Sequence, residues 1–278
     1  MKSGAHGPLE RTLQLSKGVG PYRERDLWAR GVSTWADFER ATQQGVVMNE
    51  RLDRELLLAI DQTRASLAAG DLEGLAGRVP EREHWRLYPY FSKRAAFLDV
   101  EADGDGALTV AGVMDEHGVG TFIRGRNLHE LPVRLANSDV WVTFNGGSFD
   151  LPVLRKNFEG LPVPKLHLDL KVILRKVRQQ GGLKEIEERL GLGRPPHLKG
   201  VRGLDAIRLW REHQSNLDPK PLRILVEYNL YDAVNLRALL EWSVNAIAEE
   251  LAWDGWERQP VFGRGDVLYD ISRLVLGL

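Results

Sequence analysis

Two acidic residues interrupt an apolar segment of the chain. Asp99 and Glu101 lie within residues 95–101 (AAFLDVE), whose composition predicts a buried strand. Because strand side chains alternate in direction, the two carboxylates share one face, with Cα atoms roughly 6.6 Å apart. Like charges at that spacing repel, and a bound cation is the simplest compensation. Mg²⁺ takes such oxygen ligands, so the pair indicates half of a phosphoryl-transfer site. The alternative is that the two acids face solvent at the end of the strand or form two salt bridges.

A second segment places an acid just after a strand. Residues 140–152 (VWVTFNGGSFDLP) begin as an apolar strand and continue into two glycines and a helix start. The glycines, Gly146 among them, allow a substrate to approach the backbone closely. Ser148 is expected to cap the new helix, which places Asp150 in its first turn, where negative charge is favourable. The alternative for Asp150 is a capping charge without a catalytic role.

A third segment predicts a helix that carries a phenol and a carboxylate on one face. In residues 222–240 (LRILVEYNLYDAVNLRALL), leucines and valines recur at helical spacing. Tyr228 and Asp232 are four residues apart, so a helix delivers both side chains to the same point. Tyr231 projects roughly 100° away from Asp232 and is expected to be structural.

Taken in order, the three segments resemble the motifs of the DEDD exonucleases in their tyrosine-containing variant, which are ribonuclease H-like 3′ to 5′ nucleases. The resemblance covers residues 92–242, and its flanks are similar to the YprB-like bacterial branch, in which histidine often stands at the place of Tyr228. It implies two Mg²⁺ or Mn²⁺ ions held by Asp99, Glu101, Asp150 and Asp232. It also implies that Tyr228 orients the attacking water. A free tyrosine with a pKa of about 10 is a poor base, so the metal must supply most of the water's acidification. The expected contacts to nucleic acid in this region are Asn145, Gly146, Ser148 and Lys184.

The expected fold class is α/β: a ribonuclease H-like mixed sheet flanked by helices, with a small helical domain at the N-terminus. Turn signals around 104–106 and 117–118 predict an antiparallel meander. The expected elements are strands at 95–101, 107–114 and 119–124, a helix near 128–136, a strand at 139–144, a helix from 148 and a short strand near 166. Asp169 follows the last strand and is expected either to support the acids or to cap a helix.

The N-terminal residues 1–85 are expected to form a helical module with a linker. Two short helical patterns around glycine turns, at 12–28 and 30–38, resemble a helix-hairpin-helix unit. Backbone amides around Gly18 and Gly20 are then expected to hold a phosphate of nucleic acid. The alternative is an ordinary turn between two helices.

Three further stretches flank these motifs. Residues 50–69 predict an amphipathic helix, and the glycine-rich residues 70–80 predict a linker before a nuclease domain at 92–242. Residues 243–278 form a C-terminal extension. Side chains such as Trp253 and Phe262 make it apolar enough to pack on a domain or a protein partner.

Composition narrows the classes of protein further. The 278 residues are 43% hydrophobic, so the chain can bury a core and is long enough for two domains. The formal net charge is −1, yet residues 171–211 carry eleven Lys or Arg against four Asp or Glu. This strip either steers phosphates toward the acids or is a solvated helix surface. Cysteine is absent, which excludes disulfides and thiolate metal sites, and no apolar leader or membrane span is present, so a cytoplasmic protein is expected.

These observations predict a metal-dependent 3′ to 5′ exonuclease acting on DNA or RNA, with a 3′ single-stranded end as the expected substrate. One alternative is a nucleic-acid-binding adaptor without catalysis, against which the complete set of acids argues. The other is an endonuclease for structured or RNA–DNA hybrid substrates.

Overall fold

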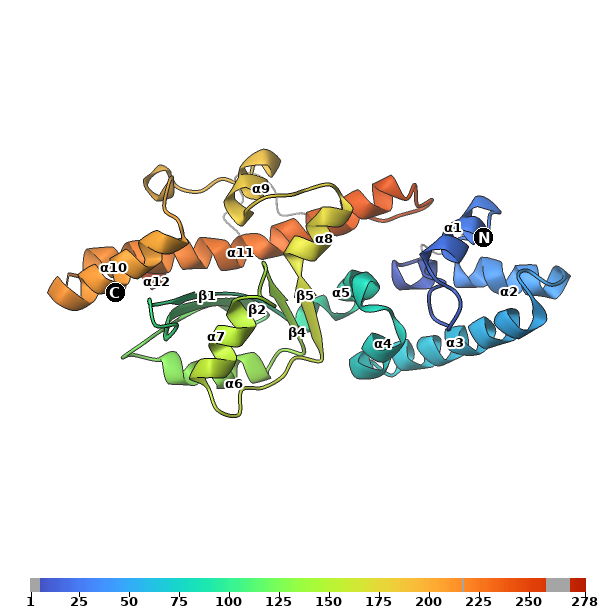
Figure 1. The fold of residues 1–278 in the computed structure, drawn as a ribbon, viewed down its shortest axis with the longest axis horizontal. Helices are drawn as coiled ribbons and strands as arrows, with labels where there is room; N and C mark the ends of the chain where they lie inside the picture. Colours follow the sequence, from blue (N-terminus) through green and yellow to red (C-terminus); the bar gives the residue numbers. More distant parts are fainter. Residues whose placement is uncertain (1–5, 217, 259–270) are drawn as a thin grey trace. The chain divides into compact units, whose positions relative to one another are not determined.

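The computed structural model describes the chain apart from residues 1–5, 217 and 259–270 (Figure 1). Its contacts divide into two compact units. The N-terminal unit contains the described residues up to 92 together with 248–258, and the second unit contains residues 93–247 and the described C-terminal residues. None of the described helices combines the length and the apolar character that a membrane span requires.

Helices build most of the N-terminal unit. With η marking a 3₁₀-helix, they are η1 (Leu9–Arg11), α1 (Pro21–Ala29), α2 (Trp35–Gln44), α3 (Glu50–Ala68), α4 (Leu72–Arg78), η2 (Glu81–Leu87) and α5 (Tyr88–Phe91). The predicted amphipathic helix is confirmed as α3, which buries Leu52, Leu56 and Ile60. Its N-cap Asn49 accepts a hydrogen bond from the amide of Leu52, which fixes the start of the helix.

The glycine-rich stretch expected to be a linker is largely folded. The side chain of Asp71 accepts a hydrogen bond from the amide of Gly74 and caps α4. Leu72 and Leu75 of this helix are buried. Their burial offsets the low helix propensity of the glycines, a tertiary effect that composition does not reveal. The linker prediction is therefore wrong for residues 72–78.

Helices α1 and α2 lie around the predicted glycine turn at 30–31, whereas residues 12–19 form turns without a helix. Gly20 is the N-cap of α1 and supplies no side-chain cap. No side chain therefore caps the first amides of α1. A phosphate can contact these amides only if they have no side-chain cap. The helix-hairpin-helix interpretation stays a prediction.

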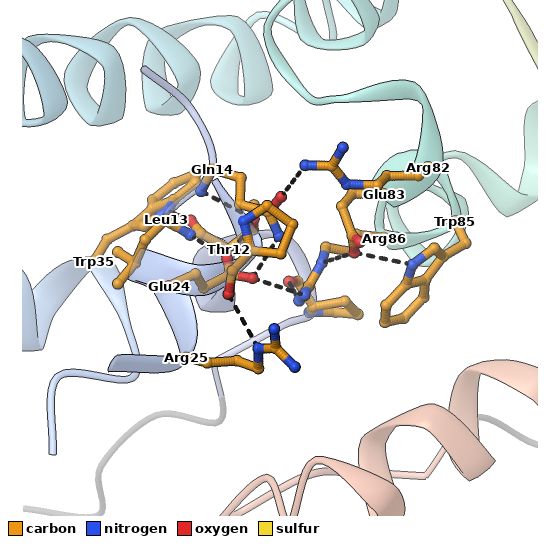
Figure 2. Close-up of polar contacts among 12 residues, drawn as sticks. Thr12, Leu13, Gln14, Glu24, Arg25, Trp35, Arg82, Glu83, Trp85 and Arg86 are labelled. Carbon is orange, nitrogen blue, oxygen red and sulfur yellow. Dashed lines mark hydrogen bonds and ion pairs between the residues drawn. The ribbon is translucent and has the colours of Figure 1, made fainter. Parts of the chain in front are cut away.

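A buried carboxylate holds the loop that precedes α1 (Figure 2). Glu24 accepts hydrogen bonds from the amide of Leu13 at 2.7 Å and from the hydroxyl of Thr12 at 2.9 Å. The side-chain amide of Gln14 donates to its other oxygen at 2.5 Å, and Arg86 approaches that oxygen to 4.0 Å. Glu24 thus fixes the loop through three donors and a buried cation.

Replacing Glu24 by alanine is expected to destabilise the N-terminal unit by about 3 kcal/mol, because buried donors and an arginine lose their acceptor together. Urea unfolding of the intact chain measures the loss, and hydrogen exchange at the Leu13 amide reports it locally. Glu55→Ala removes the exposed partner of Arg51 and should change stability by less than about 0.5 kcal/mol. Unchanged exchange at Leu13 in Glu24→Ala would contradict the anchoring role.

Residues 248–258 of the C-terminal extension pack within the N-terminal unit, whereas the described residues 271–278 belong to the second unit. Trp253 stacks on the buried Trp85 with ring centroids 5.9 Å apart, and Trp256 meets Trp253 edge-on at 5.6 Å. The guanidinium of Arg86 lies 5.1 Å from the centroid of Trp253. Phe262 lies outside the described residues. These contacts explain why residues 248–258 belong to this unit.

A five-stranded mixed sheet forms the centre of the second unit. Its strands are β1 (Ala95–Ala102), β2 (Leu108–Asp115), β3 (Gly118–Ile123), β4 (Val140–Thr143) and β5 (Leu166–Asp169), in the order β3-β2-β1-β4-β5. The pairs β1–β2 and β2–β3 are antiparallel, and β4 and β5 extend the sheet in parallel with β1. The predicted meander and the α/β class are confirmed.

Helices cover both faces of this sheet (Figure 1). The remaining helices and 3₁₀-helices of the described chain are η3 (Ser92–Arg94), η4 (Leu128–Glu130), α6 (Leu131–Ala136), α7 (Asp150–Asn157), α8 (Leu170–Lys176), α9 (Leu183–Leu190), η5 (Pro196–Leu198), α10 (Gly203–Asn216), α11 (Pro219–Glu250) and α12 (Ser272–Leu276). One apolar cluster joins β1 and β2 to α6 and α7, and another joins β2 and β3 to α10 and α11. The long helix α11 therefore lies on the face of the sheet opposite α6 and α7.

A glycine lets α11 approach the sheet closely. Gly112 of β2 pairs with Asp99 of β1. A Cβ atom at position 112 would lie 2.7 Å from Oδ1 of Asn229 and 3.3 Å from the backbone oxygen of the same residue. A side chain there would push α11 away from the strand that carries Asp99, so this glycine sets the depth at which α11 packs.

Candidate active site

Asp99 and Glu101 point from β1 toward α11, as alternation along a strand predicts. Their neighbour Val100 is buried in the apolar cluster on the opposite face. The pairing of β1 with β2 shifts register between Glu101 and Ala102, so the acid lies at a bulge near the end of the strand. Asp232 comes from α11. One carboxylate oxygen each from Asp99, Glu101 and Asp232 lies within 4.8 Å of the others.

Asp150 joins these acids from the first turn of α7. Its Oδ1 accepts a hydrogen bond at 3.1 Å from the amide of Val100, which lies between the two acids of β1. Asp150 is buried but does not belong to the group within 4.8 Å. The expected cap is wrong, because Ser148 is exposed and Phe149 is the N-cap, without a side-chain bond. Asn145 has a φ of 62°, and after this left-handed turn the helix begins at Asp150 rather than at 148.

Asp169 holds the loop between β4 and α7. Its Oδ1 accepts hydrogen bonds from the amide of Asn145 at 2.8 Å and from the amide of Lys171, at the start of α8, at 3.0 Å. The helix cap expected of Asp169 is therefore confirmed, and its expected support of the acids stays a prediction. A Cβ atom on Gly146 would lie 2.1 Å from the hydroxyl of Thr143, so the loop requires glycine there.

Tyr228 and Asp232 lie one turn apart on α11, and Lys184 of α9 contacts both. The Lys184 ammonium donates a hydrogen bond to the Tyr228 hydroxyl and lies 3.9 Å from the centroid of its ring. The same ammonium lies 3.9 Å from Oδ2 of Asp232. Tyr231 packs against the apolar cluster of α10 and α11, as expected of a structural residue.

Burial and mutual repulsion raise the pKa values of several groups in the site. Burial and repulsion by Asp232 raise the pKa of Asp99 and of Glu101 well above the ordinary range. Burial raises the pKa of Asp150 to about 7, and Asp232 adds repulsion. Burial and the charge of Asp232 also raise the pKa of Tyr228, which therefore stays a neutral phenol at pH 7.

This donor set fits a hard divalent cation. Oxygens of Asp99, Glu101 and Asp232 converge, and the raised pKa values of the first two acids mean that their negative charge is not fully compensated by the protein. A divalent ion removes this repulsion and prefers oxygen ligands. The three residues offer only carboxylates, so the set favours Mg²⁺ or Mn²⁺ over metals that select thiolate or imidazole.

A comparison with protein families assigns the fold. A family model described as the RNase H superfamily matches residues 96–244, more than half of the chain. The chain belongs to the RNase H superfamily. A search of curated proteins found no match. RNase H-like nucleases act on nucleic acid and generally use divalent metals, so membership supports a nuclease in which the converging acids bind metal.

In this RNase H-like domain the acids line a cleft of about 1110 Å³. Its walls come from β1, from the loop after β4 and from helices α8 to α11. The basic side chains that line it are Lys171, Arg175, Lys184 and Arg202. Phe149 also lines it and is 44% exposed. The cleft thus offers cations for phosphates and an aromatic ring for a base.

Three residues of the RNase H-like site, Asn229, Arg194 and Glu187, are not among the predicted site residues. Asn229 donates to Oδ2 and to the backbone oxygen of Asp99 at 2.8 and 2.9 Å. Arg194, in the loop after α9, donates to Asp232 and to Glu187. In the sequence, Asn229 directly follows Tyr228 and Glu187 lies three residues after Lys184, and both belong to the flanks that resemble the YprB-like branch. Arg194 has no comparable signal in the sequence.

Proposed function

We propose that the chain is a metal-dependent exonuclease that hydrolyses phosphodiester bonds from the 3′ end of DNA or RNA. The observation that carries the proposal is the convergence of Asp99, Glu101 and Asp232 in a cleft lined by basic side chains. Asp150 lies beside the strand of the first two acids, and Tyr228 lies one turn from the third. The 3′ to 5′ polarity rests on the resemblance of the three motifs to the DEDD exonucleases.

The carboxylates and Tyr228 would have different roles in hydrolysis. When bound, two Mg²⁺ or Mn²⁺ ions would supply activation of water and stabilisation of the departing 3′ oxygen. The residues that would hold them are Asp99, Glu101, Asp150 and Asp232. The raised pKa of Tyr228 keeps its hydroxyl protonated, so Tyr228 would act as a hydrogen-bond donor rather than a base. Because Lys184 donates to the hydroxyl oxygen, the phenol proton is directed elsewhere and is available to a reacting oxygen.

The cleft supports binding of a single strand beside these acids. Lys171 and Arg175 on α8 and Arg202 before α10 would contact successive phosphates. Lys171 also donates to the side chain of Asn145 at 3.2 Å, which keeps this predicted substrate contact beside the basic wall. Phe149 would stack on a base, a contact that tolerates any sequence.

Cleavage assays with defined substrates test the proposal. The intact protein is incubated with 5′-labelled single-stranded DNA, duplex DNA and RNA, in Mg²⁺, Mn²⁺ or EDTA. A ladder that shortens one nucleotide at a time, and that disappears in EDTA, is the expected result. Internal cuts without a ladder would indicate an endonuclease, and binding without cleavage an adaptor; either outcome contradicts the exonuclease proposal.

The N-terminal unit would contribute affinity rather than chemistry. Gly18 and Gly20 stand before the uncapped start of α1, where backbone amides can receive a phosphate. Lys17 beside them is exposed. Such contacts read the nucleic-acid backbone and carry no base specificity.

Charge reversal at Lys17 is expected to weaken binding of long substrates and to lower the slope of log K against log salt by about 1, because one phosphate contact is lost. Cleavage of short oligonucleotides at saturation should stay unchanged. Lys220→Glu, an exposed reversal in the other unit, is the matched control and should leave the slope unchanged. Equal slopes for Lys17→Glu and the wild type would argue that this loop does not contact nucleic acid.

A further inference from the structure

A buried arginine bridges Asp232 and a glutamate on a neighbouring helix. Arg194 donates through Nε and Nη2 to the two oxygens of Glu187, at 2.7 and 2.8 Å. Its Nη2 also donates to Oδ1 of Asp232. The side chain of Glu187 is 1% exposed and that of Arg194 is 9% exposed. These bonds therefore form largely out of contact with solvent, where charge-assisted hydrogen bonds are strong.

The bridge begins and ends on α11. Asn235 of that helix donates to Oε1 of Glu187 at 3.0 Å, so the contacts run from Asn235 through Glu187 and Arg194 to Asp232. Lys184, three residues before Glu187 on the same face of α9, lies 3.9 Å from Oδ2 of Asp232. The Asp232 carboxylate is thus held through Oδ1 by a planar guanidinium that is itself fixed by Glu187.

The arginine of this bridge keeps its positive charge. Burial alone would lower the pKa of Arg194, but Asp232 and Glu187 raise it overall, so the guanidinium stays protonated. Without Arg194, two buried carboxylates would lose their shared donor.

A guanidinium at this place has two conceivable roles: it orients the carboxylate, or it occupies the place of a cation. The anchoring contacts favour the first role. Arg194 makes two hydrogen bonds to Glu187, which lies outside the group of acids that converge within 4.8 Å. Arg194 can therefore stay in place when a divalent ion compensates those acids.

We infer that Arg194 is a positioning residue: anchored by Glu187, it orients the carboxylate of Asp232 as a ligand in the proposed metal site. This inference rests on the proposed function, because it assumes that Asp232 binds a divalent ion. Groups that hydrogen-bond to ligating carboxylates typically account for 10–100-fold in metal affinity. We expect a contribution of that size from Arg194.

Titration with Mn²⁺ alone tests the inference independently of cleavage. Isothermal calorimetry on the full chain compares the wild type with Arg194→Gln and Arg194→Lys, and thermal unfolding without metal confirms that each variant is folded. Both variants should bind Mn²⁺ about 10–100-fold more weakly, because lysine keeps the charge but cannot form the fork to Glu187. Glu187→Gln should weaken binding as well. Arg51→Gln, which removes an exposed ion pair, should bind like the wild type.

The outcomes separate the two possible failures. A wild-type chain that binds no Mn²⁺ would refute the proposed metal site, and with it the proposed function. If the wild type binds Mn²⁺ and Arg194→Gln binds it equally well, Arg194 makes no contribution to metal binding; if the variant binds more tightly, Arg194 is a competing cation. Either outcome refutes the positioning role. If Arg194→Lys binds like the wild type, the charge alone matters and the role of the fork is refuted. Should Arg194→Gln fail to fold, the affinity of Arg194→Lys decides.

Discussion

Asp232→Asn and Asp99→Asn are each expected to lower the rate of cleavage about 10³-fold or more. Each substitution removes ligand charge from the proposed two-ion site, and a loss of about 4 kcal/mol of transition-state stabilisation corresponds to that factor. Single-turnover cleavage of a 5′-labelled oligonucleotide in Mg²⁺ or Mn²⁺ measures the effect. Substrate binding in EDTA should change little, because the cations that line the cleft remain.

The same Asp99→Asn substitution should raise the melting temperature of the metal-free protein. The pKa of Asp99 is raised by burial and by neighbouring carboxylates, so its charged form costs stability at neutral pH. Asparagine has nearly the same shape without the charge. Asp105→Asn, an exposed substitution in the turn after β1, is the control and should alter neither rate nor stability. Wild-type cleavage by Asp99→Asn, or cleavage that persists in EDTA, would rule out the two-ion proposal.

Tyr228→Phe is expected to reduce turnover about 10²-fold while Mn²⁺ affinity stays within about twofold of the wild type. The substitution deletes the hydroxyl that is proposed to orient a reacting oxygen, a type of loss that typically costs 10²-fold or more. The ring remains, and so does its contact with the Lys184 ammonium, 3.9 Å from the ring centroid. Turnover at saturating metal and substrate, together with a calorimetric Mn²⁺ titration, separates the hydroxyl from the ligands.

Tyr231→Phe provides the matched control for that experiment. Tyr231 lies on the same helix but packs against the apolar cluster of α10 and α11. Its variant should cleave at nearly the wild-type rate. If Tyr231→Phe cleaved slowly and Tyr228→Phe cleaved at the wild-type rate, the orienting hydroxyl would belong to Tyr231 and the role proposed for Tyr228 would be wrong.

Local pattern was sufficient for the strand that carries Asp99 and Glu101 and for the helix that carries Asp232. The alternation in 95–101 predicts the shared face of Asp99 and Glu101, and the four-residue spacing of Tyr228 and Asp232 predicts their shared face on α11. Both follow from the periods of strand and helix, which depend only on backbone geometry. The structure places the convergent acids as these periods require.

Predictions from local sequence pattern were wrong where tertiary contacts outweigh the local preference. The glycines at 74 and 77 favour a linker, but α4 forms because Leu72 and Leu75 are buried. Ser148 is a good capping residue, yet the turn at Asn145 moves the start of α7 to Asp150 and leaves Ser148 exposed. In both cases the deciding free energy comes from residues that are brought together only by the fold.

By itself, the sequence indicated the mixed sheet through pattern and resemblance together. It determined the order of the three motifs and which acids share a face, because strand and helix periods fix which side chains lie on one side. Only the tertiary structure decided what surrounds those acids. Asn229 reaches Asp99 across 130 positions because Gly112 lets α11 pack closely on β2. Arg194 reaches Asp232 because α9 and the loop after it pack against α11. Such contacts depend on the packing of separate elements and leave no periodic signal along the chain.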